Sequence, residues 1–218
     1  MIIKSKPLPL YLLKLAAYFL SLGFKYRFNK VIIRPADVKP DHSYILMCNH
    51  FSFWDGLFAF YLAIYGIHKH QNVKALYVMS VKKQMEKKWW LRYIGSFSIE
   101  PGKRSVQQSL EYAAEVLSIP GNVLLYYPQG NLETSHIRHV VFKEGILEIV
   151  QRIKGNCQLI WSSNLTDYFE SLKASLYFNM YDCGTNHDFD FDELKSKVNQ
   201  YHLQAIQKNI RFTDEPEA

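Results

Sequence analysis

A histidine and an aspartate with four residues between them, His50 and Asp55, form the pair in this sequence best suited to proton transfer. His50 follows the apolar residues 44–48, which predict a buried strand, and Asp55 begins the apolar residues 55–67, which predict a buried helix. The carboxylate is then placed to fix the imidazole tautomer, which leaves the second ring nitrogen to take a proton from a hydroxyl. The alternative is a structural pair, with His50 at the strand end and Asp55 in the first turn of the helix.

A second segment of interest, residues 126–131, ends another apolar run, at residues 123–127. It contains Gly130, and a glycine at such a position lets backbone amides approach a ligand oxygen, as at anion sites and oxyanion holes. A simple proline-containing turn is the alternative interpretation.

Apolar runs and helical periodicities alternate along the chain, which predicts one α/β domain with a mostly parallel central sheet flanked by helices. In such sheets, ligands bind at the carboxyl ends of the strands. Period-two alternation at residues 172–180 predicts a strand with one wetter face. Ser105 is the predicted cap of the helix at residues 105–118. The strands are expected at residues 44–48, 75–79, 123–127, 158–161 and 172–180, and the helices at residues 55–67, 82–93, 105–118, 145–153 and 192–210.

Charge is concentrated at the N-terminus, where residues 1–34 hold seven basic residues and no acid, leaving 19 basic and 20 acidic residues elsewhere. The apolar residues 10–24 contain Lys14 and fall short of the roughly 20 residues that a spanning helix needs. They predict an amphipathic helix that lies in a membrane interface. A signal or spanning anchor, or an ordinary packing helix, are the alternatives.

The predicted membrane contacts are basic residues of this segment and two tryptophans beside further lysines: Lys14, Lys25, Arg27, Trp89 and Trp90. For the tryptophans, burial under a solvated helix is the alternative. The predicted location is peripheral or monotopic, at the cytoplasmic face of the inner (plasma) membrane.

Other classes of protein fit less well. A nucleic-acid binder usually carries its basic surface on the folded domain, so no nucleic-acid partner is expected. The three cysteines are odd in number and match no metal spacing, which favours buried reduced thiols. The acidic residues 188–193 lack a calcium-loop pattern and predict a helix N-terminus, so we expect no metal.

The two loops, taken in order, resemble the glycerolipid acyltransferase family, whose best-known members acylate glycerol-3-phosphate or 1-acylglycerol-3-phosphate. The first family motif, a His-x4-Asp pattern in its Asn-His-x-Ser-x-x-Asp-Gly setting, matches residues 49–56. Counterparts of the second and third motifs lie at residues 95–101 and 127–131, and a Phe-Lys-x-Gly stretch lies at residues 142–145. The resemblance covers about residues 10–180 and divides the chain into a membrane-associating segment, 1–34, and an acyltransferase domain, 35–218.

By this resemblance, His50 is the general base and Asp55 orients it. The implied substrate-binding residues are Asn49, Ser52, Gln129, Gly130, Asn131, Lys103, Arg104 and Lys143. Two positions depart from the family: Pro101 stands where an arginine is usual, and Gln129 where a glutamate is usual. A proline lacks the bidentate grip of arginine on phosphate, so the acceptor site is altered while the catalytic pair is intact.

The resemblance implies an O-acyltransferase in lipid metabolism, of the phospholipid-biosynthesis type, that moves a fatty acyl group from acyl-CoA or acyl carrier protein to a hydroxyl of a lysophospholipid or related lipid. The thioester is a co-substrate, and no cofactor is expected. Two alternatives stay open: a non-phosphate acceptor such as a glycolipid, a carotenoid glycoside or an amino-acid lipid, or a catalytically silent membrane-binding module.

Overall fold

The structure, a computed structural model, describes residues 2–135, 137–168 and 171–209. Its strands form one sheet in the order β1-β7-β6-β2-β5-β3-β4. Within the described residues, β6 and β7 pair antiparallel and every other neighbouring pair is parallel. The predicted fold class is therefore confirmed. The strands are β1 (Val31–Arg34), β2 (Ser43–Cys48), β3 (Ala75–Val81), β4 (Ser96–Ile99), β5 (Asn122–Tyr126), β6 (Cys157–Asp167) and β7 (Ser175–Thr185).

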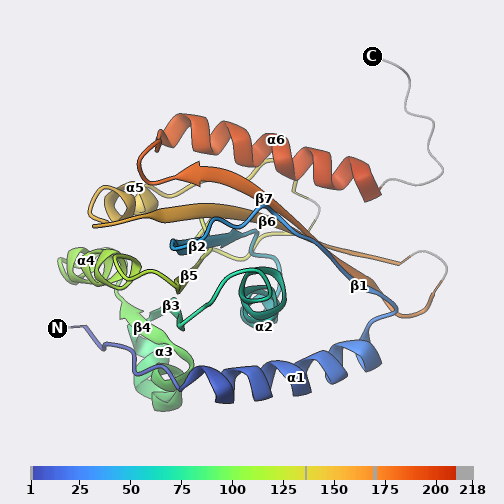
Figure 1. The fold of residues 1–218 in the computed structure, drawn as a ribbon, viewed down its shortest axis with the longest axis horizontal. Coiled ribbons are helices and arrows are strands. Elements are labelled where there is room, and N and C mark those ends of the chain that lie inside the picture. The colour runs from blue at the N-terminus through green and yellow to red at the C-terminus, as the bar shows by residue number, and fades with distance from the viewer. Residues whose placement is uncertain (1, 136, 169–170, 210–218) are drawn as a thin grey trace.

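Helices cover both faces of the sheet (Figure 1). Tyr44 and Leu46 of β2 face α1 and α2, while Ile45 and Met47 face α4, α5 and α6, as the side-chain alternation of a strand requires. Because both faces are covered, β2 is buried along its whole length. The helices are α1 (Leu10–Arg27), α2 (Asp55–Leu62), the π-helix η1 (Ala63–His68), α3 (Lys82–Lys87), the 3₁₀ helix η2 (Trp89–Ile94), α4 (Ser105–Leu117), α5 (Gly145–Val150) and α6 (Phe191–Asn209).

The predicted N-terminal helix exists, and it packs against α2 on the same side of the sheet. Leu13, Ala17 and Phe24 of α1 are buried in the same cluster as residues of α2. The predicted boundary at residue 34 falls at the end of β1, which joins the sheet beside β7. Among the described residues, no helix combines the length and apolarity needed to cross a membrane.

Three local predictions are wrong. The strand β7 has no wetter face in its first half, because α6 covers the face that carries Ser175, Tyr177 and Asn179, and all three are buried. The helix predicted at residues 82–93 is divided into α3 and η2 by Lys88, whose backbone is not helical. Ser105 does not cap α4, since its hydroxyl donates to the Glu100 carboxylate instead.

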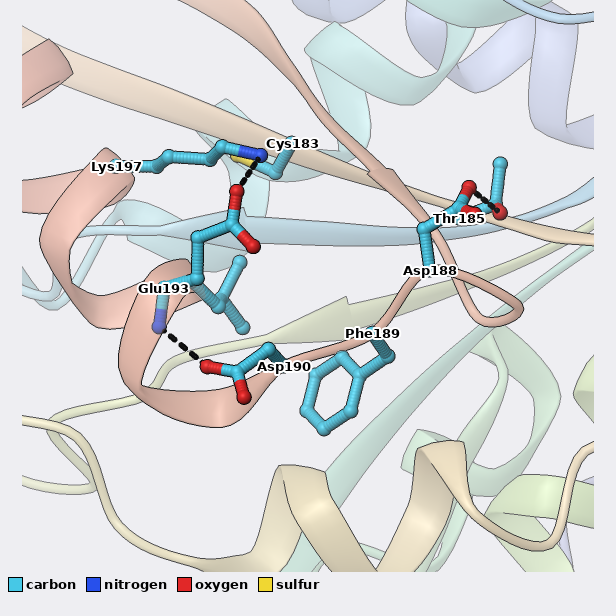
Figure 2. Close-up of a pocket in the computed structure, with 8 residues that line it drawn as sticks. Cys183, Thr185, Asp188, Phe189, Asp190, Glu193 and Lys197 are labelled. Atoms are coloured by element: carbon cyan, nitrogen blue, oxygen red, sulfur yellow. Dashed lines mark hydrogen bonds and ion pairs between the residues drawn. The ribbon is translucent and has the colours of Figure 1, made fainter.

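The last helix agrees with its prediction up to Asn209, and Ile210 lies outside the described residues. The acidic segment forms its N-terminus, as predicted. Figure 2 shows this end, where Thr185 donates to Asp188, Lys197 pairs with Glu193 at 2.6 Å, and Asp190 accepts from the Glu193 amide. These acids are thus engaged with their own neighbours, at the edge of the sheet opposite His50.

Candidate active site at the carboxyl edge of the sheet

The His50–Asp55 pair is formed in the turn between β2 and α2. Asp55 is fully buried in the first turn of α2, and its Oδ2 atom accepts a hydrogen bond from His50 Nδ1 at 2.8 Å. The same oxygen accepts from the backbone N–H groups of Phe51 and Ser52, at 2.7 and 2.8 Å. One carboxylate oxygen therefore shapes the turn and orients the ring. With Nδ1–H donated to Asp55, Nε2 of the neutral ring is left as a proton acceptor.

The ring of His50 also has an aromatic neighbour that the sequence analysis did not single out. Tyr127, directly after β5, stacks on His50 with ring centroids 4.5 Å apart and an interplanar angle of 28°. Burial raises the pKa of Tyr127 well above its usual value, and the nearby Cys48 and Asp55 raise it further. The phenol is therefore neutral, and its hydroxyl has no hydrogen-bond partner within the described chain. His50 itself remains 27% exposed, so a substrate has access to the ring.

The backbone of His50 is held by the loop after β5. Gln129 is buried, and its Oε1 accepts from the His50 N–H at 2.7 Å. The other end of the same amide, Nε2, donates to the carboxylate of Glu133. The Glu133 N–H in turn donates to the His50 carbonyl at 2.9 Å. Both polar ends of Gln129 thus have partners inside the protein, and Glu133 is a site residue that the sequence analysis missed.

Gly130 occupies the left-handed backbone region, with φ of 67°, at the end of the turn that begins at Tyr127. Its N–H donates to the Tyr127 carbonyl at 3.1 Å, so this amide belongs to the turn. A Cβ added here would lie 2.7 Å from Nζ of Lys143, so the lysine side chain crosses directly over the glycine. The structure therefore brings the exposed Lys143 to the loop that holds His50. Asn131 follows on the exposed side of the loop.

Two motif residues predicted to bind substrate have structural contacts. Asn49 exchanges two hydrogen bonds with the backbone of Asn164 in β6, donating to its carbonyl at 3.0 Å and accepting from its N–H at 2.7 Å. The Ser52 hydroxyl accepts from the Trp54 N–H at 3.1 Å. Asn49 thus joins the ends of β2 and β6, and Ser52 stabilises the turn that carries Asp55.

Lys103 and Arg104 are exposed after β4, and β5 and β3 lie between that strand and β2. Three strand spacings place them about 14 Å along the sheet from His50. In the same region Lys82 pairs with Glu100 at 3.1 Å, and together with Ser105 it lowers the pKa of Glu100. The structure thus does not bring Lys103 and Arg104 into contact with His50.

The predicted membrane contacts lie on α1 and on η2, which is joined to the segment before α1. Lys14, Lys25 and Arg27 are exposed on this helix, and Trp89 and Trp90 of η2 are 69% and 49% exposed, so the alternative of buried tryptophans is wrong. Backbone hydrogen bonds from Lys6 and Leu8 to Arg92 and Tyr93 tie the segment before α1 to η2. Figure 1 shows α1 and α3 along the same side of the molecule.

Comparisons with known proteins identify a family and a solved structure with a similar fold. A family model described as Acyltransferase matches residues 30–161, more than half of the chain. Among solved structures, the chain is similar to the 1-acyl-sn-glycerophosphate (LPA) acyltransferase PlsC from Thermotoga maritima, with a TM-score of 0.64 and 14% identity over 94% of this chain and 82% of that one. No curated protein sequence matches the chain. The family match spans both the His50–Asp55 turn and the Gln129 loop, and the chain therefore belongs to the acyltransferase family.

Proposed function

We propose that this enzyme is an O-acyltransferase that moves a fatty acyl group from a CoA or acyl carrier protein thioester to a hydroxyl of a lipid acceptor, with His50 as general base. The observation that supports this most directly is the hydrogen bond from His50 Nδ1 to the buried Asp55, at 2.8 Å. The His50 ring itself remains partly exposed. Such a pair has its second nitrogen free to accept a proton.

In the proposed reaction, Nε2 of His50 takes the proton of the acceptor hydroxyl while the hydroxyl oxygen attacks the thioester carbonyl carbon. The tetrahedral intermediate then breaks its carbon–sulfur bond, and the thiolate leaves with the proton held by His50. Asp55 stabilises the transient imidazolium, as a buried acid does beside a general base. The thioester is already activated, so the step needs no serine or cysteine nucleophile.

The phosphate-bearing and phosphate-free acceptors remain two candidates. A lysophospholipid acceptor is supported by the family and by the exposed cation of Lys143, which lies over Gly130 in the loop that holds His50. An acceptor without phosphate is supported by Pro101, which supplies no cation, and by Lys82, which is already paired with Glu100. Gln129, whose two polar ends bind within the chain, also supplies no charge to a ligand.

We also propose that the enzyme works at the cytoplasmic face of the inner membrane, held there by α1 and η2. The outer side of α1 carries a row of exposed apolar side chains at helical spacing, with lysines and no acid among them. Each lysine or arginine near an anionic surface adds about 1 kcal/mol of attraction. The exposed residues of this row are Tyr11, Leu15, Tyr18, Phe19, Leu22 and Tyr26.

The test is thiol release from palmitoyl-CoA and palmitoyl carrier protein in the presence of anionic phospholipid vesicles. Each donor is combined with 1-acylglycerol-3-phosphate, a glycolipid and an amino-acid lipid. His50→Ala is compared with His70→Ala as a matched control. His70 is an exposed histidine two residues after the end of η1.

We expect wild type and His70→Ala to release thiol only with one acceptor class, and His50→Ala to lose at least about 99% of this rate while remaining folded. Equal rates for the two variants would exclude His50 as the base. If wild type binds vesicles but acts on none of the acceptors, the silent membrane-binding module becomes the better interpretation.

A further inference from the structure

Gln129, Glu133 and the backbone of His50 form a closed ring of hydrogen bonds beside the catalytic pair. The His50 N–H donates to Gln129 Oε1, Gln129 Nε2 donates to the Glu133 carboxylate, and the Glu133 N–H returns to the His50 carbonyl. This ring is called the His50 clamp below. It holds the peptide groups on both sides of the His50 Cα from a single loop.

From this arrangement we propose that Glu133 is a positioning residue, which acts through the amide of Gln129 to fix the direction of the His50 imidazole for acyl transfer. The inference rests on the proposed role of His50 as general base. It assigns to Glu133, two residues after the counterpart of the third family motif, a part in setting the reaction geometry.

The polarity of the clamp explains why residue 129 is an amide. The side chain at 129 accepts from the His50 N–H at one end and donates to a carboxylate at the other, which an amide does and an ionised carboxylate cannot. A glutamate at 129 would still accept from His50 but would place a second carboxylate against Glu133. Two carboxylates in contact repel each other. The clamp therefore accommodates one carboxylate and one amide at positions 129 and 133.

The orientation of the His50 ring depends on its side-chain contacts and also on its backbone, to which the clamp binds. Asp55 holds Nδ1, and Tyr127 supports one face of the ring. The peptide before the His50 Cα is held by Gln129, and the peptide after it is shared between Glu133, at its carbonyl, and Asp55, at the Phe51 N–H. A shift of about 1 Å in a catalytic group costs up to a hundredfold in rate.

The test is a charge exchange within the clamp. Glu133→Gln keeps an acceptor for the Gln129 amide, Gln129→Glu places two carboxylates together, and the double variant Q129E/E133Q restores one carboxylate and one amide with their positions reversed. The matched control is Glu111→Gln, an exposed glutamate on α4. For each protein, kcat, the KM for palmitoyl-CoA, the pH–rate profile and the urea midpoint of unfolding are measured.

We expect Gln129→Glu to lower kcat at least about tenfold with the thioester KM unchanged, and the double variant to recover to within about threefold of wild type. In the double variant the carboxylate accepts directly from the His50 N–H, where it stabilises the imidazolium. The acid limb of its pH–rate profile should therefore move to higher pH, a change that a purely structural contact would not cause. The other titratable groups in contact with His50 are Asp55 from α2 and Tyr127 after β5. Cys48 at the end of β2 lies near Tyr127, and Lys143 lies over Gly130 of the loop.

The proposal is overturned if the effects of the two single substitutions on kcat simply multiply in the double variant, or if Gln129→Glu is as active as wild type. The urea midpoints separate this result from failure of the proposed function. If wild type transfers no acyl group but the midpoint falls in Gln129→Glu and returns in the double variant, the clamp exists and the function is wrong. If activity is present and neither kcat nor the midpoint shows coupling, the clamp is wrong and His50 remains the base.

Discussion

The imidazole of His50 lies nearly parallel to the phenol ring of Tyr127, at a centroid distance of 4.5 Å. The ring face of tyrosine is electron-rich and attracts a cation placed over it. A protonated His50, which the proposed reaction forms transiently, is therefore stabilised from its face by Tyr127 and from its edge by Asp55. Two substitutions separate this contribution from that of the buried hydroxyl.

Tyr127→Leu removes the ring, and we expect kcat to fall by about two- to tenfold, which corresponds to the roughly 0.5–1.5 kcal/mol of an aromatic contact. Tyr127→Phe keeps the ring and removes a hydroxyl that is unpartnered in the described chain. Its kcat should stay within threefold of wild type, and its free energy of unfolding should rise by up to about 1 kcal/mol. Equal activity losses in both variants would show that the hydroxyl, and not the ring face, matters.

Asp55→Asn tests whether the carboxylate orients His50. The substitution keeps the size of the side chain, but an amide nitrogen facing Nδ1 or the Phe51 and Ser52 N–H groups would meet a donor. We expect kcat to fall by at least about a hundredfold, by analogy with the loss when the acid of a catalytic triad is made an amide. The rate is measured beside a circular dichroism spectrum, and a folded variant with wild-type kcat would contradict the assignment.

Asn49→Ala should lower the free energy of unfolding, because Asn49 contacts the backbone of another strand. The substitution leaves the N–H and carbonyl of Asn164 without the partners that Asn49 supplies, in a fully buried position. Such losses cost about 1–3 kcal/mol for each buried group left unpaired. Urea unfolding measures the change. A loss of kcat with no loss of stability would indicate that Asn49 contacts substrate instead.

Vesicle binding tests the surface formed by α1 and η2. Phe19→Ser and Trp89→Ser each remove an exposed apolar side chain, and full burial of such a side chain is worth about 1.5–3 kcal/mol. Each should weaken binding to anionic vesicles about tenfold or more in a sedimentation assay. Leu203→Ser, on α6 at the opposite side of the molecule (Figure 1), is the control and should bind as wild type does. Equal binding by all three would place the lipid contact elsewhere.

The alkaline stability of the fold should depend on its buried thiols. Burial raises the pKa of Cys157 and of Cys183 from 9.0 to about 12. The unfolded thiols lose their protons first, so their contribution to stability is complete below pH 9 and is lost as the pH rises from 9 to about 12. Each group then lowers the free energy of unfolding by about 1.4 kcal/mol per pH unit. Urea unfolding of wild type and Cys157→Ala checks this, since the variant should decline less steeply.

The part of the site that is local in sequence was predictable, and the part that depends on tertiary contacts was not. His50 and Asp55 belong to one strand–turn–helix unit, so an apolar strand, a short loop and an apolar helix were enough to place them together. Glu133 lies in an irregular loop whose position is set by hydrogen bonds to the backbone of His50, and no periodicity marks such a residue. Sequence patterns likewise gave no reason to pair Asn49 with Asn164, 115 residues away.

The fold followed the same division. The buried strands and the parallel sheet were predicted from apolar runs and their alternation with helices. The face of β7 was mispredicted because its polar residues suggested solvent, whereas α6 covers them. Trp89 and Trp90 could be interpreted either as core or as surface residues, because composition alone does not show which side of a short helix meets the protein.

The helix α1 has one apolar side in the core, through Leu13, Ala17 and Phe24, and another that is exposed. If a bilayer takes up the exposed side while the buried side stays docked, the bilayer binds the folded chain. Lipid is then a ligand of the native state, and the melting temperature should increase with vesicle concentration, as for any ligand that binds the folded form alone. The enzyme would accordingly be most resistant to unfolding where its substrates reside, and a pool of free protein would be the more readily degraded one.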